Sequence, residues 1–200
     1  MPEQLSNEVR QSRKPEHEVH PLILNRWSPR AMSGEEVSDN ELMPLFEAAR
    51  WAPSSYNNQP WRFVYARRNT KDWDKLFGLM GEFNQSWAKN AAVLIVVASK
   101  KTFDFNGKPS ITHNFDAGAA WQNLALEAAR KGLVAHGMEG FDYGKAREAL
   151  EIPGDYDVEC MIAVGRKGRK EDLPKEMQER ETPSTRKPLK EIIMEGKFRK

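Results

Sequence analysis

The amino-acid sequence predicts a fold that combines α-helices with β-strands in a single domain, residues 1–200. Apolar residues recur at helical spacing within residues 38–51 and 115–131, whereas residues 61–66, 91–98 and 161–165 have the composition of strands. A chain of this length buries a sizeable core, so we expect it to fold without a disulfide or a structural metal.

The first predicted helix, residues 38–51, carries signals at both ends. Ser38 and Glu41 have the spacing of a capping box, which satisfies backbone N–H groups of the first helical turn. Pro44 makes the start of the helix less definite. Pro53 forces the residue before it out of the helical conformation, so the helix is expected to end there. The apolar face consists of Leu42, Leu45, Phe46 and Ala49.

The second predicted helix, residues 115–131, is followed by Gly132, a typical C-capping residue. Small or apolar residues occupy most of its circumference, which predicts that the helix is buried on most sides. It is expected either at the centre of the core or at a subunit interface, where Gly118 and its neighbouring alanines permit close approach.

Three segments are predicted to be strands. Residues 61–66 alternate in the manner of a half-buried strand, and residues 91–98 form a continuous apolar run typical of a strand buried on both faces. Residues 161–165 are the third. Residues 132–142 differ because Gly137 and Gly140 would let the backbone approach a flat ligand, although a glycine-rich turn between helices has the same composition.

The two ends of the chain are polar. Residues 1–21 contain three prolines and are predicted to form an extended N-terminal arm, in which His17 and His20 are exposed to solvent. Residues 166–200 form a charged C-terminal extension with 12 basic and 7 acidic residues. We expect this extension to become ordered only by docking on its own core or on a partner.

The composition excludes several classes of protein. A formal charge of +2 argues against a surface that binds nucleic acid or an acidic membrane. The C-terminal extension offers one aromatic residue, Phe198, and so no stacking platform for bases. The longest apolar run, residues 91–98, is far shorter than the roughly 20 residues that span a membrane. The lone Cys160 and the absence of a secretory signal predict a cytoplasmic protein.

Motif searches narrow the chemistry further. The sequence contains no glycine-rich dinucleotide or P-loop motif, no paired cysteines and no serine-hydrolase elbow. Its four histidines are scattered at positions 17, 20, 113 and 136. We therefore expect neither a hydrolytic triad nor a metal site.

Four segments have chemistry suited to a ligand. Residues 26–30 (RWSPR) place two guanidiniums around a hydroxyl, which suits a phosphate or carboxylate. Residues 52–61 (APSSYNNQPW) supply amides and hydroxyls suited to a polar, planar ligand. The glycines of residues 137–142 and the basic pair of residues 186–189 complete the set. Each segment taken alone also fits an ordinary surface turn.

Taken together and in this order, the four segments resemble the nitroreductase family of FMN-dependent NAD(P)H oxidoreductases. The resemblance spans about residues 22–195, and the PSSYNNQPW loop is its most specific part. It implies an α+β fold, an α/β/α sandwich with a central, mostly antiparallel sheet. It also implies a homodimer with exchanged terminal segments and an FMN at each of two subunit junctions.

The resemblance assigns the following residues to FMN. The phosphate end and the pyrimidine edge of the ring would be bound by Arg26, Trp27, Ser28, Arg30, Asn84 and Arg186. The FMN of the other subunit would be reached by Pro53, Ser54, Ser55 and Asn57. The ring would be lined by Gly137, Met138, Glu139 and Gly140, with the Glu139 N–H directed at N5. No catalytic side chain is implied, because the cofactor carries the chemistry.

The implied reaction passes a hydride from NADH or NADPH through FMN N5 to a nitroaromatic, quinone or similar acceptor, with ping-pong kinetics. Two alternatives remain open: a flavoenzyme of the same fold with other redox chemistry, such as a dehydrogenase or dehalogenase, and a non-catalytic flavin-binding protein. Trp87 and Ser184 stand where some family members carry basic residues. These two departures predict either looser retention of FMN or a lower reduction potential of the flavin.

Overall fold

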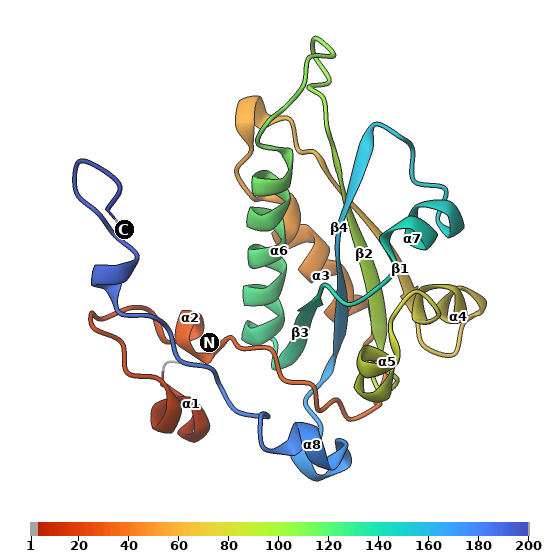
Figure 1. Cartoon of the computed structure of the whole chain (residues 1–200). Helices are drawn as coiled ribbons and strands as arrows, with labels where there is room; N and C mark the ends of the chain where they lie inside the picture. The colour runs from red at the N-terminus through yellow and green to blue at the C-terminus, as the bar shows by residue number, and fades with distance from the viewer. Residues whose placement is uncertain (1–3, 200) are drawn as a thin grey trace.

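The structure, a computed structural model, describes residues 4–199 and contains a four-stranded sheet at its centre (Figure 1). The strands are β1 (Trp61–Arg67), β2 (Val93–Lys100), β3 (Leu133–Met138) and β4 (Tyr156–Arg166). Their order is β1-β2-β4-β3, and each neighbouring pair is antiparallel. The antiparallel sheet expected from the resemblance is therefore confirmed.

Helices cover both faces of this sheet. One face carries α3 (Asp39–Arg50) and α6 (His113–Arg130); the other carries α4 (Lys71–Phe77), α5 (Glu82–Ala88) and α7 (Tyr143–Ala149) (Figure 1). Each face of the sheet has its own hydrophobic core, and alternate side chains of strand β2 point into one core or the other. Ile95 packs with α3 and α6, whereas Leu94 and Val96 pack against the opposite helices. The layers form the expected α/β/α sandwich.

Helix α3 begins and ends close to the predicted positions. The backbone N–H of Ser38 donates to the Glu41 carboxylate at 3.0 Å, and the capping box is present. These bonds lower the pKa of Glu41 to about 2, with a further contribution from Arg166. Pro44 lies inside the helix without ending it.

Within a single chain, helix α6 is buried along one side only. Leu124 and Ala128 are fully buried against the sheet, whereas Phe115 is 78% exposed and Gly118 is also exposed. The helix is therefore not at the centre of its own chain's core. Gly132 follows it with a φ of +75°, a left-handed conformation that favours glycine at the end of a helix.

Two strands differ from the sequence-based expectation. Residues 133–138 were expected in a glycine-rich turn or ligand-approach segment, but they form β3 and pair with β4 from Leu133↔Arg166 to Met138↔Met161. Strand β4 begins at Tyr156, five residues before the predicted start. Its first five residues are only partly buried, so they lack the apolar pattern that marks a core strand.

The N-terminal arm is more ordered than the extended segment that the sequence predicts, and the C-terminal tail is docked on the rest of the chain. The arm contains α1 (Asn7–Ser12), with Val9 fully buried, and is followed by α2 (Pro21–Asn25). The tail contains η2 (Lys170–Asp172), α8 (Lys175–Gln178) and η3 (Leu189–Glu191). Arm and tail run side by side (Figure 1) and meet where the Leu189 N–H donates to Glu16. None of the helices within residues 4–199 is long and apolar enough to cross a bilayer.

Candidate functional site

A cleft rich in arginine opens where the arm, the RWSPR segment and the tail converge. Its volume is about 360 Å³, and it is lined by Arg13, Arg26, Trp27, Ser28, Arg30, His136, Arg180, Thr182, Ser184 and Arg186. The structure thus brings together both ends of the chain, including all five residues assigned to the cofactor from residues 26–30 and 186. Arg13, Arg180 and His136 were not anticipated from the sequence.

The RWSPR segment is held from two sides. On the sheet side, a ring nitrogen of His136 hydrogen-bonds the Pro29 carbonyl at 3.1 Å. On the tail side, the Glu181 carboxylate accepts the backbone N–H groups of Arg30 and Ala31 at 2.7 and 2.8 Å. Because Glu181 is 7% exposed, this clamp fixes the backbone of the cleft and docks the tail.

The electrostatics of the cleft favour an anion. Burial lowers the pKa of Arg26, and the positive charge of Arg186 lowers it further. The Nε atom of Arg30 and the Nη2 atom of Arg13 are buried without a hydrogen-bond partner. Buried polar groups are ordinarily satisfied, so the unpaired guanidinium nitrogens make this cleft a candidate site for an anion such as phosphate.

His136 is neutral in this setting, because burial lowers its pKa to about 4. Its ring lies 4.6 Å from that of Trp87, which is 2% exposed. The Trp87 Nε1–H group donates to the Asn84 side-chain oxygen at 3.2 Å. Trp87 therefore connects the arginine-rich cleft to Asn84, which lies one turn earlier in the same helix, α5.

Asn84 and Gly140 form a second part of the site. The Asn84 amide donates to the Gly140 carbonyl at 3.0 Å, and a Cβ atom on Gly140 would lie 2.8 Å from that amide nitrogen. Both residues border a hollow of about 630 Å³ between α5 and α7. Gly137 is also constrained, because a Cβ there would lie 3.2 Å from the Trp121 ring. The glycines thus permit close packing that larger residues would prevent.

Met138 and Glu139, the two residues between Gly137 and Gly140, differ in which of their atoms a ligand could contact. The Met138 side chain is 5% exposed and belongs to the core, so its backbone is what remains for a ligand. Glu139 is exposed at the end of β3.

The PSSYNNQPW loop lies away from the arginine-rich cleft. Its η1 turn (Ser55–Asn57) sits beside the first turn of α6, where the Ser55 N–H donates to Asp116 at 3.1 Å (Figure 1). Tyr56 and Asn57 have φ values of 52° and 53°, so the loop holds a left-handed conformation. Within one chain the structure does not bring Pro53, Ser54, Ser55 and Asn57 to the residues of the cleft.

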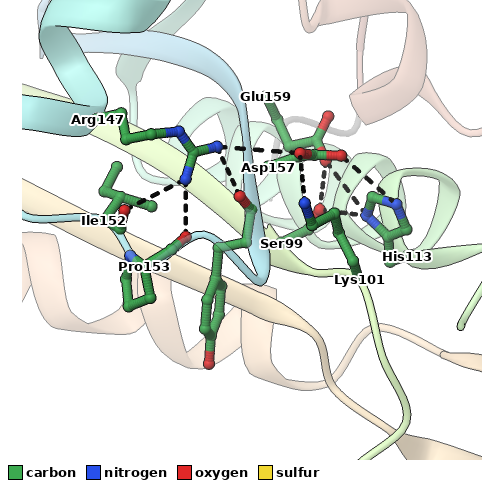
Figure 2. Close-up of polar contacts among 9 residues, drawn as sticks. Ser99, Lys101, His113, Arg147, Ile152, Pro153, Asp157 and Glu159 are labelled. Atoms are coloured by element: carbon green, nitrogen blue, oxygen red, sulfur yellow. Dashed lines mark hydrogen bonds and ion pairs between the residues drawn. The ribbon is translucent and has the colours of Figure 1, made fainter. Parts of the chain in front are cut away.

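A polar cluster that the sequence did not suggest lies at the start of α6 (Figure 2). The Ser99 hydroxyl meets a ring nitrogen of His113 at 2.7 Å and bonds Glu159, while Asp157 lies 3.8 Å from the other ring nitrogen. The cluster lacks an accessible nucleophile because Ser99 is fully buried, so it joins α6 to β2 and β4. No group of three or more His, Cys, Asp or Glu side chains suited to a metal occurs in residues 4–199.

Comparisons with known proteins relate this chain to the nitroreductase family. The sequence profile described as "Nitroreductase family" matches residues 23–82 and 69–166. An oxygen-insensitive NADPH nitroreductase of Helicobacter pylori (strain J99) is 40% identical over 155 residues, covering 75% of this chain and 67% of the relative. Protein DrgA of Synechocystis is 30% identical over 169 residues, covering 69% of this chain and 77% of the relative.

Solved structures extend the likeness to the fold. A crystal structure described as an oxidoreductase containing FMN has a TM-score of 0.90 and 46% identity, covering 94% of this chain and 96% of that one. A putative nitroreductase in complex with FMN from Desulfovibrio desulfuricans has a TM-score of 0.70 and 28% identity, covering 92% and 100% of the two chains. The family profile matches well over half of the sequence, and the chain belongs to the nitroreductase family.

Proposed function

We propose that this protein is an FMN-dependent oxidoreductase that uses NADH or NADPH to reduce a nitroaromatic, a quinone or a similar oxidised acceptor. The observation that carries the proposal is the cleft in which Arg26, Arg30 and Arg186 converge and in which the Nε atom of Arg30 is buried without a hydrogen-bond partner. It is supported by the family match and by the related structure described as an oxidoreductase containing FMN.

The cleft fits the phosphate end of FMN. A phosphate carries nearly two negative charges and three acceptor oxygens at neutral pH, which match guanidinium and hydroxyl donors. Arg26, Ser28 and Arg186 would supply those donors, while the Trp27 backbone shapes the same wall. The Arg26 guanidinium already contacts the Ser28 hydroxyl at 3.3 Å, so the two groups are placed to bind one anion.

The ring end would be held by Arg30, Asn84 and the backbone of residues 137–140. Arg30 would place a positive charge near N1 and O2, and the Asn84 amide would meet the pyrimidine edge. The Glu139 N–H group would be directed at N5. FMN, when bound, supplies hydride acceptance and donation, whereas the protein supplies orientation and electrostatics.

Proton supply does not need a side chain of this site. The pKa of His136 is lowered to about 4, so its ring is neutral near pH 7 and is a poor proton donor there. Protons would come from solvent. Donor and acceptor would occupy the same open face of the site in turn, which predicts ping-pong kinetics.

The proposal includes a homodimer. The loop bearing Pro53, Ser54, Ser55 and Asn57 lies apart from the cleft of its own chain (Figure 1), and the exposed side of α6 carries Phe115 and Gly118. If two α6 helices pack through these sides, the loop of one chain would reach the FMN of the other. The exposed apolar tail residues, such as Ile192 and Ile193, would be covered by the same partner.

An absorbance spectrum of the purified protein tests the proposal when it is followed by anaerobic titration. After saturation with FMN and removal of free flavin, we expect a bound flavin spectrum that NADH or NADPH bleaches. An added nitroaromatic or quinone should then restore the oxidised spectrum. Protein that retains no flavin, or flavin that neither nicotinamide bleaches, would contradict the proposal.

A further inference from the structure

Arg13, the C-cap residue of α1, is held rigidly at the edge of the cleft. Its Nη1 atom donates to the carbonyl oxygens of Leu24 at 2.5 Å and Arg26 at 2.9 Å. Its Nε atom donates to the Ser184 carbonyl at 3.0 Å. All three acceptors are main-chain atoms, and they come from segments near both ends of the chain. The plane of the guanidinium is therefore fixed by the fold.

The remaining hydrogen-bonding capacity of Arg13 lies on a single atom. A guanidinium has five N–H groups, and the Nε and Nη1 contacts account for three of them. The other two are on Nη2, which is buried and has no partner. Since Arg13 lines the cleft, a ligand bound there would supply an acceptor for Nη2.

The charges around Arg13 specify an anion. Burial lowers the pKa of Arg13, and the neighbouring cations Arg186 and Arg26 lower it further. Within residues 4–199, no carboxylate forms an ion pair with these three arginines. A ligand with more than one negative charge would relieve the repulsion among them.

We propose that Arg13 binds the phosphate of FMN, so that the N-terminal arm forms part of the cofactor site. This inference rests on the proposed function. It also gives a role to Ser184, which stands where the resemblance leads us to expect a basic residue. Ser184 contributes its main-chain carbonyl, which orients Arg13, and Arg13 supplies the positive charge.

The arm is fastened well enough to keep Arg13 in place. Val9 is fully buried, the Ser6 N–H donates to the Asn25 side chain at 2.9 Å, and Glu8 forms an ion pair with Lys167. These contacts join α1 to α2 and to the segment after β4. The position of Arg13 is thus built into the fold and does not depend on the ligand.

Flavin binding by the full-length, flavin-free protein tests the assignment. FMN and riboflavin, which lacks the phosphate, are titrated and followed by flavin fluorescence. Arg13→Gln should weaken FMN binding at least about tenfold and leave riboflavin binding within about twofold, because only the phosphate loses a charged donor. Arg10→Gln is the matched control: Arg10 lies in the same helix, is exposed, and should alter neither flavin.

A second variant and a charge-sensitive measurement separate binding from a structural role. If Arg13→Gln does not fold, Arg13→Lys is tested in its place. Its FMN binding should be at least about threefold weaker and its riboflavin binding unchanged, because an ammonium group cannot reproduce the planar fork of donors that a guanidinium offers. In ³¹P NMR, the pKa of the bound phosphate should rise in the Arg13 variant, because a cation that favours the dianion is lost.

The outcomes are distinguishable. Equal weakening of FMN and riboflavin, or an unchanged phosphate pKa, would give Arg13 a structural role only and overturn the assignment. Wild-type protein that binds FMN as tightly as its Arg13 variants would also overturn it while leaving the proposed function intact. Wild-type protein that binds neither flavin would overturn the proposed function and this assignment together.

Discussion

Arg186 and Lys187 are neighbours in the C-terminal tail, but only Arg186 lines the cleft. Its Nη1 atom donates to the Ser184 hydroxyl at 2.9 Å and to the Thr185 carbonyl at 2.8 Å, which turns the side chain back along the tail. Lys187 is exposed. The two side chains therefore carry the same charge in different surroundings.

We predict that Arg186→Ala weakens FMN binding about tenfold or more, whereas Lys187→Ala changes it less than twofold. A charge in contact with the phosphate acts at short range, whereas a charge outside the cleft is screened by solvent and salt. Fluorescence titrations of both variants at two salt concentrations measure the difference. Equal effects would mean that the tail contributes only a general positive potential.

His136 makes the stability of the fold depend on pH. Its pKa is lowered from 6.5 to about 4, chiefly by burial, so the unfolded chain binds a proton at His136 more readily than the folded chain does. Stability should thus fall as pH decreases from 6.5 towards 4. The shift corresponds to about 3 kcal/mol once pH is below 4, and to about 2 kcal/mol at pH 5.

Urea unfolding of the flavin-free protein at pH 7 and pH 5 tests this prediction. The cofactor is left out because its phosphate titrates near pH 6. Between pH 7 and pH 5, the free energy of unfolding of His136→Gln should fall by about 2 kcal/mol less than that of the wild type. The pKa of Glu41 is lowered from 4.5 to about 2. Protonation of Glu41 therefore destabilises the fold only at lower pH and does not mask the contribution of His136 between pH 7 and pH 5. Parallel losses in both proteins would contradict the assignment.

Among the elements, the end of β3 depends most on close packing. A Cβ on Gly140 would lie 2.8 Å from the Asn84 amide nitrogen, which is held by the Gly140 carbonyl, while the Asn84 oxygen accepts from Trp87. Alanine at position 140 therefore has to displace Asn84. Gly154, in the turn before β4, has open space around it and serves as a matched control.

We predict that Gly140→Ala weakens FMN and riboflavin by the same factor, about tenfold, because Asn84 is assigned to the ring and both flavins carry that ring. Gly154→Ala should leave both affinities unchanged. Fluorescence titration of the two flavins measures this. A loss confined to FMN would place Asn84 and Gly140 at the phosphate end and contradict the assignment.

Element boundaries were predictable where local patterns determine them. The capping box and Pro53 locate α3, and the apolar run locates β2, because these signals act within a few residues. Strand β3 was not predicted, since it pairs with a strand more than 20 residues later and its glycines resemble those of a turn. The composition of α6 left two placements open, the centre of the core and a subunit interface, because it shows which residues are apolar but not which of them the same chain covers.

In the proposed dimer, the completeness of the cofactor site depends on the exposed side of α6. Gly118 lies on that side with open space around it. In the proposed dimer, this is where two chains approach closely, and each chain brings its Ser54 to the site of the other. The isolated chain would then hold an incomplete cofactor site.

We predict that the wild type has twice the 22.9 kDa mass of the chain in light scattering. Gly118→Arg should give a monomer, because a large charged side chain prevents close helix packing, and FMN binding should weaken with it. Gly154→Arg, a change of the same size on a surface away from α6, should remain dimeric. Monomeric wild type that binds FMN fully would contradict the shared site.

Local sequence patterns were enough to predict the helices and strands with strong periodicity and to single out the RWSPR segment, the PSSYNNQPW loop and Arg186. Those features depend on the chemistry of consecutive residues. Packing between distant segments brings Arg13, Arg180 and His136 into the cleft and places Ser99 against His113 and Glu159. Arg13 and Ser184 are 171 positions apart and meet because both ends of the chain pack on the same edge of the fold. No short-range pattern records a contact of that kind.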